Sequence, residues 1–217
     1  MQNLSLDNNS VISSDCGSLE DFSLDQAQLV AIDMSNTDKS QIVKQLMAQM
    51  STVGFCLVTN VPGHNEEELL EAIKCFHNLP IEEKMKMAPK HFNQENSNTV
   101  HGYFPFLEND PSFKEFYDMA RPLSDISKWE KGGCPLYEEQ RWLDDSGNAC
   151  GENNSNLKLK WVHKKFTQHF SSMHKLALQL ISCLAVGLGK RADYFDSWFK
   201  DECSSVFRAI HYNPRGE

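Results

Sequence analysis

The feature that most constrains the fold of this chain is a long run of helical periodicity in its C-terminal third. Between positions 157 and 188 an apolar side chain recurs every third or fourth residue, which places these side chains on one face of an α-helix. The pattern predicts one amphipathic helix over about 157–186, which Gly187 and Gly189 end. A helix with one apolar face needs another layer of structure to cover it. The apolar positions are Leu159, Val162, Phe166, Phe170, Met173, Ala177, Leu180, Ile181, Leu184 and Leu188.

Shorter elements are predicted on both sides of this helix. Apolar runs bounded by turn-forming residues are typical of buried strands, and apolar residues at helical spacing after a capping residue indicate helices. Pro80 breaks one helix because it disfavours helical geometry at Leu79. Residues 89–154 show poor periodicity and are predicted to be loops with short elements. The predicted elements are a strand at 29–33, a helix from Thr37-Asp38 to Gly54, a strand at 55–59, a helix from Glu66 to Leu79 and a strand at 204–212.

The net charge of the chain disfavours two classes of binding partner. The formal net charge is −9 and the pI is about 5.4, so no nucleic acid and no anionic membrane surface is expected as a partner. One basic cluster, Lys158, Lys160, Lys164 and Lys165, has helical spacing, so a solvated helix face explains it. No stretch of the sequence approaches the roughly 18 apolar residues of a membrane span.

The seven cysteines indicate a reduced, cytoplasmic protein. Their number is odd and no Cys-x-x-Cys pair occurs, so neither a disulfide framework nor a zinc ribbon is predicted. Residues 1–25 are rich in Ser, Asn and Asp and lack the basic and apolar segments of a secretory signal. They are predicted to form a disordered tail.

Five short motifs follow one another in an order that is characteristic of one protein family. They are TVGFCLVTN at 52–60, FHNLPIEEK at 76–84, HGY at 101–103, KEFYDMARP at 114–122 and VFRAIHYNP at 206–214. Each motif is short, but five in the same order are specific. Together they cover about residues 28–216, and they resemble the isopenicillin N synthase-like family of non-haem iron, 2-oxoglutarate-dependent oxygenases.

The resemblance implies an α+β fold. An N-terminal helical and mixed extension is followed by the first strands of a double-stranded β-helix (a jelly roll), which is incomplete in this chain. An eight-stranded roll needs on the order of 80 or more residues, so its remainder is expected beyond Glu217. The implied segments are a disordered tail at 1–25, an N-terminal non-haem dioxygenase domain at 26–155, a long scaffold helix at 156–190 and the start of the jelly-roll core at 191–217.

The resemblance also implies a chemistry for the parent enzyme. In the family, a His-x-Asp pair and a distal His hold Fe(II) and leave three positions for 2-oxoglutarate and dioxygen, which together oxidise a small-molecule substrate. Members close to isopenicillin N synthase itself dispense with the 2-oxo acid. None of these iron ligands is recognised before Glu217. The 217-residue chain alone is therefore expected to hold no catalytic residue, no metal and no cofactor.

Two tyrosines are the predicted site residues. Tyr212 matches a family tyrosine on the first core strand, where a phenol can donate to a carboxylate, so it is predicted to bind the cofactor. Tyr103 matches a region that borders the substrate pocket and is predicted to bind substrate. Packing in the core is the alternative role for both. Asp118 and Arg121 are predicted to form a structural ion pair.

The histidines are not predicted to bind metal. His64-Asn65-Glu66 has the form of a His-x-Glu pair, but it lies at a helix start, where the helix dipole explains the Glu. His163, His169 and His174 are six and five residues apart, which is not the spacing that shares a helix face. His211 is expected to face the outside or a neighbouring helix.

Three hypotheses for the function remain open. The first is an oxygenase whose catalytic half lies beyond Glu217. The second is a catalytically inactive, truncated protein that acts as an interaction module and exposes an apolar face on the long helix, where the jelly roll would otherwise dock. The third is a helical binding protein unrelated to oxygenases, which the five ordered motifs disfavour.

Overall fold

The computed structural model describes residues 29–120, 136, 138, 142, 154–199 and 205–214. The predicted disordered tail at 1–25 and the residue Arg121 lie outside this part of the chain. The described residues form a mixed α and β fold with two short sheets, one of two strands and one of three. Among the described helices, none has both the length and the apolar character needed to cross a membrane.

The N-terminal unit is a parallel strand pair joined by a helix. Strand β1 (Ala31–Asp33) lies beside β2 (Leu57–Thr59), and α1 (Lys39–Thr52) connects them. The Asp38 carboxylate accepts hydrogen bonds from the backbone N–H groups of Ser40 and Gln41, which caps α1 as predicted. After the helix, Gly54 has a φ of +83°, a conformation that favours glycine.

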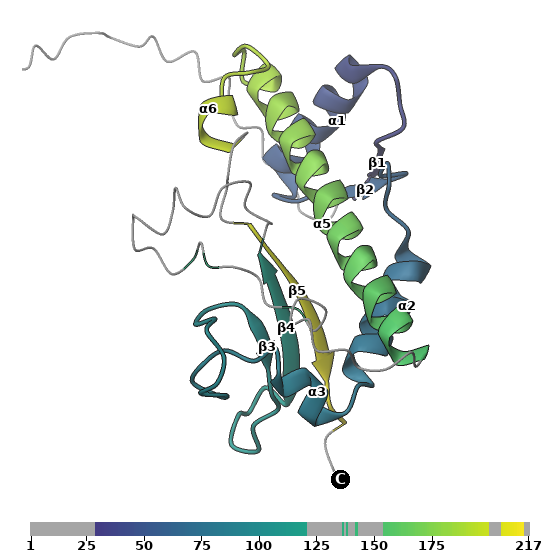
Figure 1. Ribbon diagram of the computed structural model, residues 1–217. Helices are drawn as coiled ribbons and strands as arrows, with labels where there is room; N and C mark the ends of the chain where they lie inside the picture. The colour runs from purple at the N-terminus through teal and green to yellow at the C-terminus, as the bar shows by residue number, and fades with distance from the viewer. Residues whose placement is uncertain are drawn as a thin grey trace, which may run out of the picture.

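The break predicted at Pro80 is confirmed. Helix α2 (Glu66–His77) is capped by the Asn65 side chain, and after Pro80 the short helix α3 (Ile81–Met85) begins. The change in direction brings α3 beside the three-stranded sheet rather than extending α2 past it (Figure 1).

The three-stranded sheet is antiparallel, with the order β3-β4-β5. It consists of β3 (Gly102–Phe104), β4 (Lys114–Ala120) and β5 (Val206–Tyr212). Two of these strands fall inside 89–154, where the sequence predicted mainly loops. Local periodicity did not indicate β4 because it is the central strand and its last four residues are all buried. The predicted segments 26–155 and 191–217 therefore share one sheet.

The long helix α5 (Asn154–Gly187) connects the two units of the fold. It has 34 residues, which corresponds to about 50 Å, and the predicted range of 157–186 lies within it. Figure 1 shows α5 passing both α1 and α2. One end packs in a cluster with Ile32, Ile42 and Leu46, and the other packs in an aromatic cluster. The aromatic cluster includes Phe76, Tyr103, Tyr117, Trp142 and Phe166.

The two faces of the three-stranded sheet differ. Alternate residues of β5, Phe207, Ala209 and His211, lie on the face that packs toward α2 and α5. The opposite face is open to solvent at Val206, Ile210 and Tyr212, whose exposed fractions are 47%, 37% and 64%. Helix α6 (Asp196–Phe199), which Figure 1 shows beside the C-terminal end of α5, exposes Trp198, at 64%. Apolar surface of this kind marks a place where a further layer can pack.

Candidate functional site at a buried carboxylate

The densest polar cluster of the described chain surrounds Glu115, on the central strand β4. Its Oε2 accepts hydrogen bonds from Lys84 Nζ at 2.7 Å and from the Tyr103 hydroxyl at 2.5 Å. Its Oε1 lies 3.0 Å from His211 Nδ1 and 3.2 Å from His77 Nδ1. The residue is 6% exposed, so one buried acid meets four polar side chains from four different elements.

The fold explains how these residues meet. In the antiparallel register, His211 of β5 lies directly opposite Glu115. Tyr103 of β3 lies opposite Tyr117, which is two residues after Glu115 on β4 and therefore on the same face of the sheet. His77 is the last residue of α2. After the break at Pro80, Lys84 reaches back from α3 and also donates to the His77 carbonyl oxygen at 3.0 Å.

The cluster keeps Glu115 ionised. Burial alone would raise the pKa of its carboxyl group, but the contacts from His77, Lys84, Tyr103 and His211 outweigh burial and hold that pKa well below its usual range. Burial, the hydrogen bond to Glu115 and the carboxylate charge raise the pKa of the Tyr103 phenol. Tyr103 therefore stays protonated and acts as a hydrogen-bond donor.

The two predicted site residues lie in different environments. Tyr103 is fully buried, with its hydroxyl committed to Glu115. Tyr212 is 64% exposed and, one residue after His211 on β5, belongs to the opposite face of the sheet. The predicted roles in substrate binding for Tyr103 and in cofactor binding for Tyr212 stay predictions. The sequence pattern could not indicate that the two side chains lie on opposite faces, because the pairing of β3 with β4 was not predicted.

Two further expectations concern His211 and Asp118. His211 faces a neighbouring helix, which was one of the two expected orientations, since its ring centroid is 5.3 Å from that of His77. Arg121, the expected partner of Asp118, lies outside the described residues, and the structure shows Arg208 as a partner of Asp118 that was not predicted. The Asp118 carboxylate accepts a bidentate pair of hydrogen bonds from Arg208, at 2.6 and 2.7 Å, because the register places the two residues directly opposite each other.

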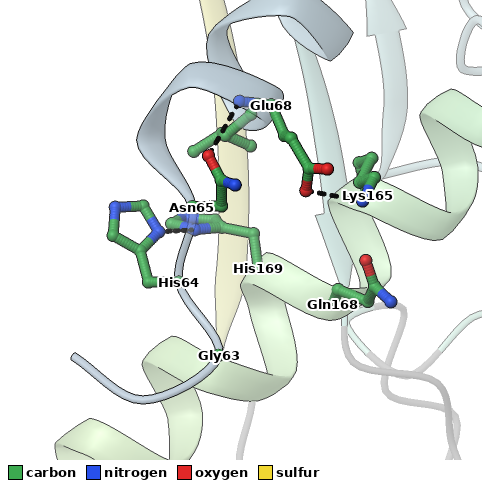
Figure 2. Close-up of a pocket in the computed structure, with 8 residues that line it drawn as sticks. Gly63, His64, Asn65, Glu68, Lys165, Gln168 and His169 are labelled. Atoms are coloured by element: carbon green, nitrogen blue, oxygen red, sulfur yellow. Dashed lines mark hydrogen bonds and ion pairs between the residues drawn. The ribbon is translucent and has the colours of Figure 1, made fainter.

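A second polar group lines a small pocket between the start of α2 and the side of α5. Figure 2 shows His64 and His169 with their rings together, and their Nδ1 atoms are 3.3 Å apart. Lys165 donates to Glu68 at 2.6 Å in the same pocket. The cavity volume is about 20 Å³, which is enough for a water molecule and too small for a substrate. Burial, followed by the neighbouring His64, lowers the pKa of His169.

The Glu115 cluster contains a group that could hold a metal ion. One ligand atom each from His77, Glu115 and His211 lie within 4.8 Å of one another, and within the described chain no other set of three such residues does so. This group could not be predicted from local sequence patterns, because Glu115 is 38 positions from His77 and 96 positions from His211. Each lies inside one of the five motifs, but the motifs give no sign that the side chains meet.

Comparison with a protein-family model supports the motif analysis. Residues 29–145, more than half of the chain, match the family described as "non-haem dioxygenase in morphine synthesis N-terminal". Isopenicillin N synthase from Amycolatopsis lactamdurans is 23% identical over 176 residues, which cover 78% of this chain and 49% of that enzyme. The chain spans about half the length of the isopenicillin N synthases it matches.

Solved structures show a similar fold. A 2OG-Fe(II) oxygenase family protein from Caulobacter crescentus superposes with a TM-score of 0.64 at 18% identity, covering 87% of this chain and 57% of that one. A full-length Neurospora crassa protein, solved in complex with alpha-KG, gives a TM-score of 0.54 at 20% identity and covers 85% of this chain and 54% of its own. At these identities the likeness concerns the fold alone.

Proposed function

We propose a function from the family to which this chain belongs, the isopenicillin N synthase-like family of non-haem iron oxygenases. The chain is the N-terminal part of an enzyme that oxidises a small molecule with Fe(II), dioxygen and 2-oxoglutarate. The observation that carries the proposal is the family match over residues 29–145. The use of 2-oxoglutarate is supported by the Neurospora crassa protein, which has a similar fold and was solved with alpha-KG bound.

The described residues do not fit the iron centre of such an oxygenase. That centre needs three open coordination positions beside two His and one carboxylate. The side chains of His77 and Glu115 are 4% and 8% exposed, and Lys84 and Tyr103 occupy the second oxygen of the carboxylate. We therefore place the catalytic iron ligands in a part of the protein outside the described residues.

Within this proposal, the described residues serve as a scaffold for the catalytic core. The Glu115 cluster holds α2, α3 and the three strands together, and α5 supports the sheet from one side. The open face of the sheet, at Val206, Ile210 and Tyr212, is then the side on which further strands of a jelly roll would pack. We propose that Tyr212 approaches the cofactor from this face, which is the role predicted for it.

The same open face supports a second candidate function. The exposed apolar residues of β5, Val206, Ile210 and Tyr212, could instead bind a partner protein in a catalytically inactive interaction module. The family match favours the oxygenase, because the module hypothesis does not explain the five motifs.

The test is to sequence the transcript through and past the codon for Glu217 and to assay the protein that it encodes. A reading frame that continues into His-x-Asp and a distal His, whose product binds Fe(II) one to one and converts 2-oxoglutarate to succinate, is the expected result. The 217-residue chain is the matched control and is expected to show no turnover. A stop codon after Glu217 would instead support the interaction module, and 2-oxoglutarate turnover by the 217-residue chain would contradict the scaffold role.

A further inference from the structure

We propose that His77, Glu115 and His211 form a binding site for a divalent transition-metal ion that ties the end of α2 to strands β4 and β5. These residues are distinct from the His-x-Asp and distal His implied for the catalytic iron. The proposal does not depend on oxygenase activity, because the site lies within the described fold.

The distances between the three ligands suit a shared ion. Glu115 Oε1 lies 3.2 Å from His77 Nδ1 and 3.0 Å from His211 Nδ1. Imidazole nitrogens and carboxylate oxygens bind zinc at about 2.0–2.2 Å, so two ligands at tetrahedral or octahedral angles stand about 3.0–3.5 Å apart. Small side-chain rotations would bring all three atoms around one ion, since they already lie within 4.8 Å of one another.

The imidazole of His77 is a buried polar group that lacks good hydrogen bonds. The residue is 8% exposed, and neither ring nitrogen has a hydrogen-bond partner among the described residues. The contact of His77 Nδ1 with Glu115 is close enough for an ion pair, but it does not have the angle of a hydrogen bond. Unsatisfied buried nitrogens are unfavourable, and a metal ion at Nδ1 would remove one of them.

The two carboxylate oxygens of Glu115 have different partners, and this leaves Oε1 available to bind a metal ion. Lys84 and Tyr103 both donate to Oε2 and fix the orientation of the carboxylate, as outer-shell groups do around metal ligands. Among the described residues, Oε1 contacts the two histidines alone. An ion can therefore bind Oε1 without breaking the Lys84 ion pair.

The ligand set and the solvent access indicate the class of ion. Two imidazoles and one carboxylate suit Zn²⁺, Co²⁺ or Ni²⁺ rather than Mg²⁺ or Ca²⁺, which prefer oxygen ligands. The His211 side chain is 45% exposed, so an ion can enter from that side and water can complete its coordination. The ion would add positive charge near the Lys84 ammonium group, which would be unfavourable in a fully closed site. Water at the exposed side would solvate this charge.

The experiment is a Co²⁺ and Zn²⁺ titration of the 217-residue chain after treatment with EDTA. We expect one Co²⁺ per chain with visible absorption bands of a nitrogen- and oxygen-bound ion, and a Zn²⁺-dependent rise in melting temperature. The variant His211→Gln should weaken binding by on the order of a hundredfold, and His77→Gln should do the same. Because His211 is exposed, its variant should keep the circular dichroism spectrum of the wild type.

Matched controls locate the ion. The variant His91→Gln changes an exposed histidine outside both clusters and should leave the Co²⁺ affinity unchanged. The variant His64→Gln tests the other histidine pair, with His169. The proposal is overturned if the folded wild-type chain does not bind Co²⁺ or Zn²⁺ at micromolar concentrations, or if affinity is lost with His64→Gln and kept with His211→Gln.

Discussion

Lys84 and Glu115 form a buried ion pair that joins α3 to the central strand of the sheet. Lys84 Nζ lies 2.7 Å from Glu115 Oε2, and both residues are 6% exposed. A buried pair of this kind is stable only when further hydrogen bonds satisfy both groups. The Tyr103 hydroxyl donates one to the carboxylate, and the ammonium group donates one to the His77 carbonyl oxygen.

The first prediction concerns this pair. The variant Glu115→Gln leaves the Lys84 charge buried without a carboxylate, and such a loss typically lowers the free energy of unfolding by about 3–5 kcal/mol. Urea denaturation followed by circular dichroism measures the change. The matched control is Glu83→Gln, which removes the more exposed pair of Glu83 with Lys86 and should cost less than about 1 kcal/mol. Equal losses in both variants would show that Lys84 and Glu115 contribute little as a pair.

The second prediction concerns Gly102, which begins β3. Its φ is +121°, and an added Cβ would lie 2.0 Å from the Met87 carbonyl oxygen, which the Tyr103 N–H needs as its acceptor. The variant Gly102→Ala should therefore lose about 3 kcal/mol or more of unfolding free energy. The control is Gly54→Ala. Gly54 has a φ of +83°, and no atom would lie within 4 Å of an added Cβ, so this variant tests backbone strain alone and should lose about 1–2 kcal/mol of unfolding free energy. If the control cost as much as Gly102→Ala, steric overlap with Met87 would not be the cause.

The third prediction concerns Arg208 and Asp118. The guanidinium group makes two parallel hydrogen bonds to the carboxylate and lies 4.1 Å from the ring centroid of Phe116. A lysine cannot reproduce this planar arrangement, so Arg208→Lys should lower the free energy of unfolding by about 1–2 kcal/mol. The control Arg191→Lys changes a similar contact with Asp193, which is solvent-exposed and should contribute close to nothing. Chemical denaturation of both variants separates these outcomes, and a larger loss in Arg191→Lys would contradict the prediction.

Local patterns predicted the helices of this fold well, for physical reasons. The apolar face of α5, the Asp38 cap of α1 and the break at Pro80 each depend on residues within a few positions of one another. Strand β4 depends instead on partners far along the chain, since Glu115 pairs with His211 across 96 positions. Local alternation predicted β5 within 204–212, whereas only the family resemblance marked the residues of β4 in advance, and neither gave the register of the two strands.

The same distinction explains the candidate site. No local spacing relates His77 to Glu115 and His211, and His64 meets His169 only because α5 packs against the start of α2. On α5, His169 contacts His64, while the ring of His163 stacks on Trp142. The sequence could not predict that His169 would contact a histidine from another element.

The final prediction uses that contact. Burial and the nearby His64 lower the pKa of His169, so the folded chain binds this proton less readily than the unfolded chain does. The unfolded chain titrates at the ordinary histidine pKa of about 6.5. The stability that His169 contributes is therefore fully present above that pH and falls as the pH drops through it toward the lower folded pKa.

We expect the urea midpoint of the wild-type chain to decrease between about pH 7.5 and pH 5.5. The variant His169→Gln should flatten this decrease, because it removes the group that titrates. The variant His64→Gln should flatten it partly, since burial of His169 remains, and His91→Gln should leave it unchanged. A wild-type midpoint that rises on acidification, or an unchanged slope in His169→Gln, would show that the packing of α5 against the start of α2 does not disfavour the charged imidazole.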